Sequence, residues 1–280
     1  MMIQYSLRPE QADGTTVFTS RAFMTTSTVV ITSNLVLVVD PAYYPEEIAE
    51  IRQFIEPHLE GRPLYLLFTH SDWDHIAGFP LFPEAVTVAS QAFRDNPLKE
   101  EPIDLLRDFD AQNQIQRPYP LAYPSVGMAI REEREELSLG GTRLILFQAK
   151  GHTEDGLFAL LDPPGLFLAG DYLSDIEIPY VFHSSAAYER TMLLASAILE
   201  EFPVHLLVPG HGHPTTDVGE MMRRVESSLR YLRSLREAVR RADEGEIERV
   251  LSETGFGPGF AKAHRENAQR IEQELRAGAP

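Results

Sequence analysis

The chain has 280 residues, of which 43% are hydrophobic and 24% charged, and its formal net charge is −17. This composition is typical of a globular protein, and the acidic excess disfavours binding to nucleic acids or to anionic membranes, which both require cationic surface. Cysteine is absent, which excludes disulfides, thiolate metal ligands and cysteine nucleophiles.

The N-terminal third predicts strands alternating with helices. The first residues, Met1–Tyr5, show no basic region followed by an apolar core, so we expect no signal peptide and a cytoplasmic location. Strands are expected where short apolar runs are bounded by turn residues, and a helix is expected where isoleucines recur at helical spacing after a proline. These strands are 29–31, 35–39, 63–68 and 85–89, and the helix is 45–57.

Between Ser90 and Glu136 the periodic pattern weakens, and five prolines interrupt it. We therefore expect this segment to be an insertion or a lid-like excursion rather than an element of the core. Regular patterns then return. A hairpin is expected over 137–149, strands over 157–161, 166–169 and 205–208, and a helix over 187–201.

After Thr215 only helical patterns remain, over about 218–239, a shorter segment, and 260–275. Residues 1–216 hold 30 acidic and 13 basic side chains, whereas residues 217–280 hold 12 of each. We therefore predict a catalytic domain, 1–216, and a C-terminal helical extension, 217–280. The arginines of the first C-terminal helix alternate with glutamates, which is typical of a solvated amphipathic face.

Metal-ligand residue types follow four of the predicted strands. They are His70, Asp72, Asp74 and His75, followed by His152, Asp171 and His211. Imidazole nitrogens and carboxylate oxygens without thiolates suit Zn²⁺, Mn²⁺ or Fe²⁺. Seven such residues are enough for two metal ions that share one carboxylate.

These motifs resemble those of the metallo-β-lactamase superfamily. The run from Thr69 to His75, Thr-His-Ser-Asp-Trp-Asp-His, is similar to the family's His-x-His-x-Asp-His loop. Gly151-His152-Thr153, Gly170-Asp171 and Gly210-His211-Gly212 are similar to its later histidine, aspartate and histidine elements. The four motifs occur in the family's order and cover roughly residues 20–215.

The resemblance implies an α/β fold, an αββα four-layer sandwich, with two divalent metal ions at one edge of its sheets. It implies that His70, position 72 and His152 form the first site. It likewise implies that Asp74, His75 and His211 form the second site, with Asp171 bridging them. Hydroxide held between the metals would be the nucleophile, and Asp74 would orient it or carry its proton.

Asp72 departs from the family pattern, which has histidine at this position in most members. Zinc is the metal that the resemblance implies, whereas the harder, anionic Asp72 favours manganese or iron. Members with glutamate at this position, the flavodiiron proteins, hold a redox-active di-iron centre. A weak first site, with one metal on the second, is a further alternative.

The segment after Asp171 is a candidate for substrate contacts, and we single out Tyr172, Tyr180 and His183. Trp73, the only tryptophan, either packs against the metal loop or lines a pocket. His211 is preferred over His213 as the metal ligand because it follows the family pattern.

We predict a metal-dependent hydrolase that cleaves a small ester, thioester, lactone or phosphoester with metal-bound hydroxide. The alternatives are a di-iron oxidoreductase, motivated by Asp72, and a non-catalytic metal-binding module. The expected partners are a small-molecule substrate and, as an assembly, a homodimer, with neither nucleic acid nor membrane among them.

Overall fold

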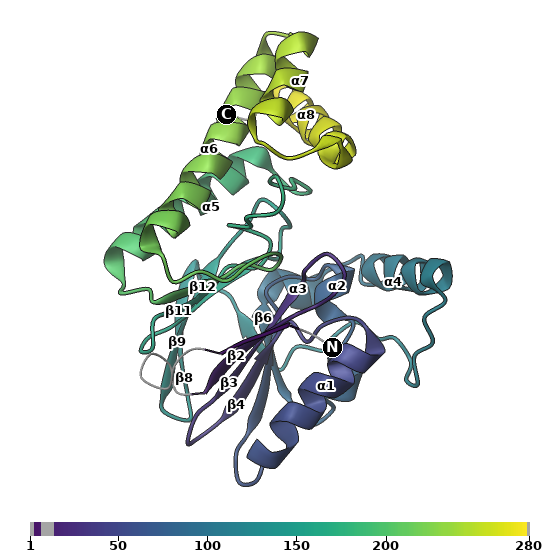
Figure 1. Ribbon diagram of the computed structural model, residues 1–280, viewed down its shortest axis with the longest axis vertical. Helices are drawn as coiled ribbons and strands as arrows, with labels where there is room; N and C mark the ends of the chain where they lie inside the picture. Colours follow the sequence, from purple (N-terminus) through teal and green to yellow (C-terminus); the bar gives the residue numbers. More distant parts are fainter. Residues whose placement is uncertain (1–2, 7–13, 279–280) are drawn as a thin grey trace.

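The computed structural model describes residues 3–6 and 14–278 and contains two β-sheets that face one another (Figure 1). The first sheet has seven strands in sequence order. They are β1 (Ile3–Ser6), β2 (Thr15–Thr19), β3 (Thr26–Ile31), β4 (Val36–Val39), β5 (Leu64–Leu67), β6 (Val86–Ser90) and β7 (Met128–Ile130). Strands β1 to β4 are antiparallel, and β4 to β7 run parallel.

The second sheet has five strands in the order β12-β11-β10-β9-β8. They are β8 (Arg134–Leu139), β9 (Thr142–Gln148), β10 (Leu157–Leu161), β11 (Leu166–Leu168) and β12 (Leu206–Val208). All pairs are antiparallel except β11 with β12. The tight turn between β8 and β9 uses Gly140 and Gly141, which both have positive φ and so adopt a conformation that glycine allows.

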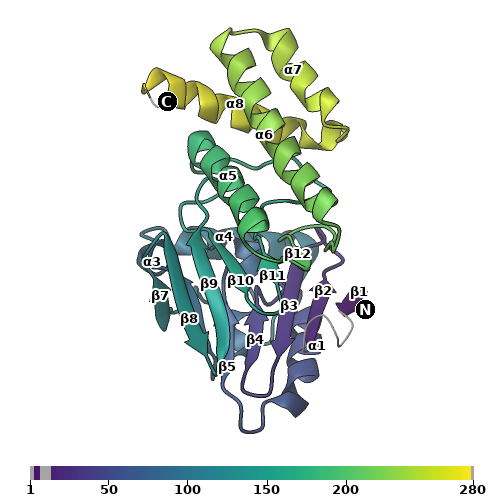
Figure 2. The same cartoon turned by 90° about the vertical axis from the view of Figure 1, so that its left-hand side faces the viewer.

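Helices cover the outer face of each sheet, so the fold is the expected αββα sandwich (Figures 1 and 2). On the first sheet lie α1 (Pro45–Ile55), α2 (Trp73–Ile76), α3 (Gln91–Asp95) and α4 (Glu100–Asn113). On the second lie α5 (Ser185–Glu201) and α6 (Val218–Arg240). Aliphatic side chains such as Val39, Leu67 and Leu146 fill the space between the sheets.

The C-terminal extension contains α6, α7 (Glu244–Glu253) and α8 (Ala261–Arg276), as the sequence indicates. Its apolar face joins one hydrophobic cluster with α5 and the second sheet, for example through Leu232 and Ile271. The expectation of a solvated face on α6 holds in part. Arg223 is exposed and pairs with Glu220 of the same helix, whereas Arg224 is buried. Arg233 and Arg236 pair with Glu189 of α5.

The expectation for 90–136 is wrong in part, because this segment contributes to the core. Strand β7 extends the first sheet beside β6, and Ile130 is buried between the two sheets. Ile103 of α4 is buried against the other face. The prolines lie mainly outside these elements and obscure their short patterns. Strands β1 and β2 were not predicted, since threonines interrupt the apolar pattern of β2.

Within the described residues no helix is long and apolar enough to cross a membrane.

Candidate metal centre

Residues of metal-ligand type gather at one edge of the two sheets, where several strands end. Strands β4, β5 and β6 are parallel, so their carboxyl ends lie at the same edge. The carboxyl ends of β9, β11 and β12 likewise share one edge of the second sheet. His70 follows β5, His152 follows β9, Asp171 follows β11, and His211 follows β12.

The short helix α2 carries the other candidate ligands. Asp72 is its N-cap residue, and Asp74 and His75 lie within its single turn. Trp73 packs against Phe109 of α4, with ring centroids 4.8 Å apart. This aromatic contact fixes the turn, so that its polar side chains face the sheet edge.

The structure brings all seven candidate ligands together in two adjacent groups. In each group the candidate ligand atoms all lie within 4.8 Å of one another. The first group consists of His70, Asp72, His152 and Asp171, and the second of Asp74, His75 and His211. Asp72 is the most exposed carboxylate among them, at 28% of its side-chain surface.

The carboxylate of Asp171 lies between the two groups. Its Oδ2 atom is 3.5 Å from Nε2 of His70 and 3.3 Å from Nε2 of His152. It is also 3.3 Å from Nε2 of His211. The other oxygen, Oδ1, is 3.0 Å from Nε2 of His75. Asp171 can therefore contribute a ligand to both groups.

Each of the four imidazoles is held through its Nδ1 atom. Nδ1 of His152 lies 2.9 Å from the carbonyl oxygen of Tyr180, and Nδ1 of His211 lies 2.9 Å from that of Phe23. A carbonyl oxygen only accepts hydrogen bonds, so both Nδ1 atoms donate. The tautomer of each ring is thereby set, with Nε2 left free to bind a metal.

The other two imidazoles are oriented by Asp40, at the end of β4. Nδ1 of His75 lies 3.0 Å from Asp40 Oδ2. The hydroxyl of Thr69 donates to the same carboxylate at 2.5 Å, and its oxygen lies 3.0 Å from Nδ1 of His70. Since the hydroxyl proton is used on Asp40, the Thr69 oxygen is the acceptor for His70.

This arrangement leaves acceptor atoms facing one another. The Nε2 atoms of His75 and His211 are 3.3 Å apart. Nε2 of His70 and Oδ1 of Asp171 are buried without a hydrogen-bond partner among the described residues. Lone pairs this close repel unless a cation lies between them. The donor set of four imidazoles and three carboxylates therefore fits two divalent metal ions.

The pKa values reflect the same need for positive charge. Burial lowers the pKa of His211, but Asp171 and Asp74 outweigh burial and raise it to about 10. Burial and His75 lower the pKa of His70, yet the neighbouring carboxylates Asp171 and Asp72 raise it to about 9. The cluster thus favours bound cations.

A comparison with protein families matches residues 20–216 to the family described as the Metallo-beta-lactamase superfamily. The matched range contains both groups of candidate ligands. The chain belongs to the metallo-beta-lactamase superfamily.

Solved structures share the metallo-beta-lactamase fold at low sequence identity. VMB-1 at pH 5.5 has a TM-score of 0.56 and 17% identity, covering 81% of this chain and 96% of its own. The DIM-1 metallo-beta-lactamase exposed to ceftazidime has a TM-score of 0.55 and 16% identity, and the match covers 81% of this chain and 97% of that protein. A variant of the sec-alkyl sulfatase PisA1 has 0.68 and 12%, covering 98% of this chain but only 50% of its own. A comparison with curated protein sequences gives no match.

Asp72 reaches the first group although it is shorter than the histidine of most metallo-beta-lactamase superfamily members. Its Oδ2 atom is 3.1 Å from Nε2 of His152 and 3.6 Å from Nε2 of His70. Burial raises the pKa of Asp72, but hydrogen bonds with His152 and His70 outweigh it and lower the pKa well below its usual range. The geometry is consistent with a dinuclear centre.

The structure separates the three residues singled out for substrate contact. Tyr172 is buried, and its hydroxyl donates to the carbonyl of Ala149 and accepts from the backbone N–H of His152. Tyr172 thus holds the backbone at His152, and its contact with a substrate stays a prediction. Tyr180 supplies the carbonyl that orients His152, and His183 lines a cavity beside the centre.

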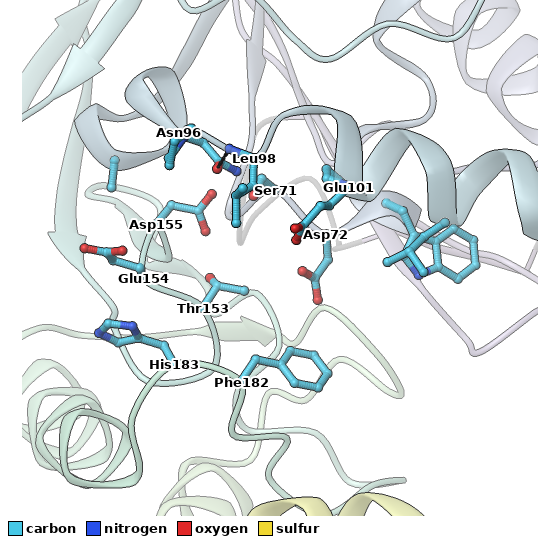
Figure 3. Close-up of a pocket in the computed structure, with 15 residues that line it drawn as sticks. Ser71, Asp72, Asn96, Leu98, Glu101, Thr153, Glu154, Asp155, Phe182 and His183 are labelled. Carbon is cyan, nitrogen blue, oxygen red and sulfur yellow. Dashed lines mark hydrogen bonds between the residues drawn. The ribbon is translucent and has the colours of Figure 1, made fainter. Parts of the chain in front are cut away.

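That cavity has a volume of about 510 Å³ and shares Asp72 with the first ligand group (Figure 3). Trp73 lines it as well as packing on Phe109, so both readings of this residue hold. His213, in contrast, is largely exposed and pairs with Asp175, 2.9 Å away.

Two residues near the centre were not anticipated. Asp40 has a positive φ of 48°, a strained conformation that aspartate tolerates better than most residues. An aspartate directly after a buried strand was the available signal. Burial and the charge of Asp171 raise the pKa of Glu177 to about 7, although His211 lowers it. Nothing in the local sequence pattern marks Glu177.

Proposed function

We propose that the protein is a hydrolase that uses two divalent metal ions to cleave a small ester, thioester, lactone or phosphoester. The observation that carries this proposal is the convergence of four Nε2 atoms and three carboxylates, with every Nδ1 atom bound to an acceptor. Such prior orientation is typical of a working metal site rather than of a chance surface cluster.

His70, Asp72 and His152 would hold the first ion and Asp74, His75 and His211 the second, with Asp171 shared. The chemistry that such ions would supply is activated water at neutral pH, since a bound divalent metal lowers the pKa of water to about 7.

The chain's own groups position the reactants. Oδ2 of Asp74 accepts a hydrogen bond from the Thr25 hydroxyl at 3.1 Å and lies 3.4 Å from Nε2 of His211. Asp74 is therefore fixed at the centre, where its carboxylate can orient the attacking water or take its proton. The cavity beside Asp72 is the space available to the substrate.

Zinc is the first expectation for the metal, from family membership, and Asp72 favours manganese or iron as alternatives. The similar structures include a metallo-beta-lactamase and a sec-alkyl sulfatase. A substrate panel therefore needs β-lactams and sulfate esters as well as esters, thioesters, lactones and phosphodiesters.

The test combines metal analysis of the purified protein with this panel of chromogenic substrates. We expect about two metal ions per chain, loss of activity on chelation, and recovery with Zn²⁺ or Mn²⁺. Asp74→Asn should remove turnover while the protein stays folded. Full turnover by thoroughly metal-free protein would overturn the proposal, and two irons with oxygen consumption would favour the di-iron alternative.

A further inference from the structure

The cavity beside the metal centre is acidic. Its wall consists of Ser71–Trp73, residues of α3, α4 and their connection, residues 153–155, and Phe182 with His183 (Figure 3). Four carboxylates line it, from Asp72, Glu101, Glu154 and Asp155. Among the described residues that line it there is no lysine or arginine.

Asp155 is the decisive residue of this wall. The residue is only 5% exposed, and both carboxylate oxygens are buried without a hydrogen-bond partner among the described residues. Figure 3 shows its carboxylate pointing into the cavity. A buried carboxylate without a partner is costly, because it has lost water and gained nothing in return.

Asp40 shows what this fold does with a structural buried carboxylate. Its oxygens accept from the backbone N–H of Thr69 at 2.9 Å, from the Thr69 hydroxyl and from His75. Asp40 is therefore satisfied by the protein alone, whereas Asp155 is not.

The backbone holds Asp155 in place, so its lack of partners does not come from a loose loop. The hydroxyl of Ser90, at the end of β6, donates to the carbonyl of Asp155 at 2.7 Å. The carbonyl of the next residue, Gly156, accepts from the N–H of Ala149 at 2.8 Å. A side chain at position 156 would meet the Ala149 carbonyl at 2.1 Å, so the loop packs tightly.

Among the residues that the structure describes, no lysine, arginine or histidine forms an ion pair with this carboxylate. The ammonium of Lys99 lies 5.6 Å from the ring centre of Tyr123, outside the residues that line the cavity. A metal ion is a poor candidate as well, because Asp155 belongs to neither metal-ligand group found in the described residues.

We propose that this cavity is a recognition site for a protonated amine on the substrate, with Asp155 as its counter-ion. This inference rests on the hydrolase function proposed above. The hydroxyl oxygen of Thr153, also buried without a partner and lining the cavity, is a further acceptor for an ammonium N–H. Groups that donate N–H suit these acceptors, whereas a quaternary ammonium offers none.

The remaining wall suits the carbon skeleton between the amine and the reacting bond. Trp73 and Phe182 line the cavity, and an aromatic face attracts a cation as well as an alkyl chain. Leu98 and Leu105 also line it and are more than half exposed, which leaves apolar surface for a chain to cover.

The charges divide the site into two parts. Two divalent ions on Asp72, Asp74 and Asp171 would leave the centre with one net positive charge. The outer wall adds three negative charges from Glu101, Glu154 and Asp155. A substrate with its reactive carbonyl at the metals and its amine in the cavity matches this division.

The test compares 4-nitrophenyl esters of equal chain length on the metal-loaded enzyme. The 6-aminohexanoate ester carries an ammonium, the heptanoate ester a methyl group in its place, and the heptanedioate monoester a carboxylate. We expect kcat/KM for the amino ester to exceed that for the heptanoate ester by about tenfold to a hundredfold, mainly through KM. The heptanedioate monoester should be the poorest of the three.

Asp155→Asn keeps the size of the side chain and removes its charge. It should remove the preference for the amino ester, so that the ratio of kcat/KM for the amino ester to kcat/KM for the heptanoate ester falls to about one. Asp108→Asn, at an exposed position of α4 outside the cavity, removes the same charge and should keep the preference. In a thermal unfolding test without ligand, Asp155→Asn should not lower the melting temperature. If Asp155 had a structural role, the substitution would lower it.

Binding of hexylammonium, with 1-hexanol as its neutral counterpart, separates this inference from the hydrolase proposal. Hexylammonium binding that Asp155→Asn abolishes supports the amine site even if no ester is cleaved. Ester cleavage without charge preference, or a preference that survives Asp155→Asn, overturns the amine site while the hydrolase stands. If no ester is cleaved and hexylammonium does not bind, the amine site is overturned as well.

Discussion

In the metal centre every imidazole Nδ1 atom has an acceptor, whereas in the neighbouring cavity the carboxylate of Asp155 has none. Both regions are built at the same sheet edge, and both bury charge. The hydrogen bonds of the centre orient the imidazole rings and leave only the metal-facing atoms without a partner. In the cavity wall, in contrast, both oxygens of the Asp155 carboxylate lack a partner among the described residues. The unpartnered atoms of the centre face other candidate metal ligands, whereas those of Asp155 belong to neither ligand group.

The largest expected effect comes from removing a ligand of the centre. His211→Gln should lower metal content from two ions towards one and reduce turnover roughly a thousandfold, since a bound metal contributes several kcal/mol to the reaction. His213→Gln is the matched control, because His213 lies two residues away and is exposed. It should change turnover by less than about twofold.

Metal analysis and kinetics on the two variants check this prediction. Equal losses in His211→Gln and His213→Gln would mean that the loop as a whole, rather than one imidazole, matters. Asp155→Asn should leave metal content unchanged, which keeps the two regions distinct.

A second prediction compares the two buried aspartates, Asp40 with hydrogen-bond partners in the protein and Asp155 without them. Asp40→Asn leaves an amide that cannot accept from Thr69 and His75 as the carboxylate does. We expect metal affinity to fall about 10-fold to 100-fold, the usual effect of removing such an orienting partner. Competition with a fluorescent zinc chelator measures it. If Asp40→Asn and Asp155→Asn weakened metal binding equally, the contrast between the regions would fail.

The sequence identifies the ligands better than the groups that support them. The four motifs place ligand residues directly after strands, and strand ends meet at a sheet edge, so their convergence follows from local pattern and topology. The role of Asp155 depends on a contact with Ser90, 65 residues away, and no local pattern encodes such a contact. Strand β7 was missed for a similar reason, since its three residues are stabilised by pairing with β6.

A smaller effect on turnover is expected from the helical extension, which contacts the metal centre through residues 179–181. Asn267 of α8 accepts a hydrogen bond from the N–H of Val181 at 2.9 Å and donates to the carbonyl of Pro179 at 2.6 Å. Between them lies Tyr180, whose carbonyl orients His152.

Asn267→Ala should therefore loosen this segment. We expect kcat/KM to fall about fivefold, which corresponds to about 1 kcal/mol, and the melting temperature to decrease. Gln269→Ala, at an exposed position of the same helix, is the control. Unchanged kinetics in Asn267→Ala would show that the extension does not position the metal centre.

The smallest effect concerns pH and lies within the extension itself. His264 is fully buried, its Nε2 donates to the carbonyl of Ile247 at 2.8 Å, and its Nδ1 accepts from the Tyr231 hydroxyl at 2.9 Å. Protonation of Nδ1 would break the hydrogen bond that this atom accepts from the Tyr231 hydroxyl. Burial accordingly lowers the pKa of His264, although the Ile247 carbonyl opposes this shift.

There is therefore a pH range in which the unfolded chain binds a proton on this ring and the folded chain does not. The contribution of neutral His264 to stability is fully present above the ordinary histidine pKa of about 6.5, and it is lost as the pH falls below that value. Denaturant unfolding from pH 7.5 to pH 5 should show a smaller loss of stability for His264→Gln than for the parent protein. Since the metal ligands titrate in both proteins, the difference isolates His264. Equal slopes would mean that the Tyr231 hydroxyl turns to let the ring take a second proton.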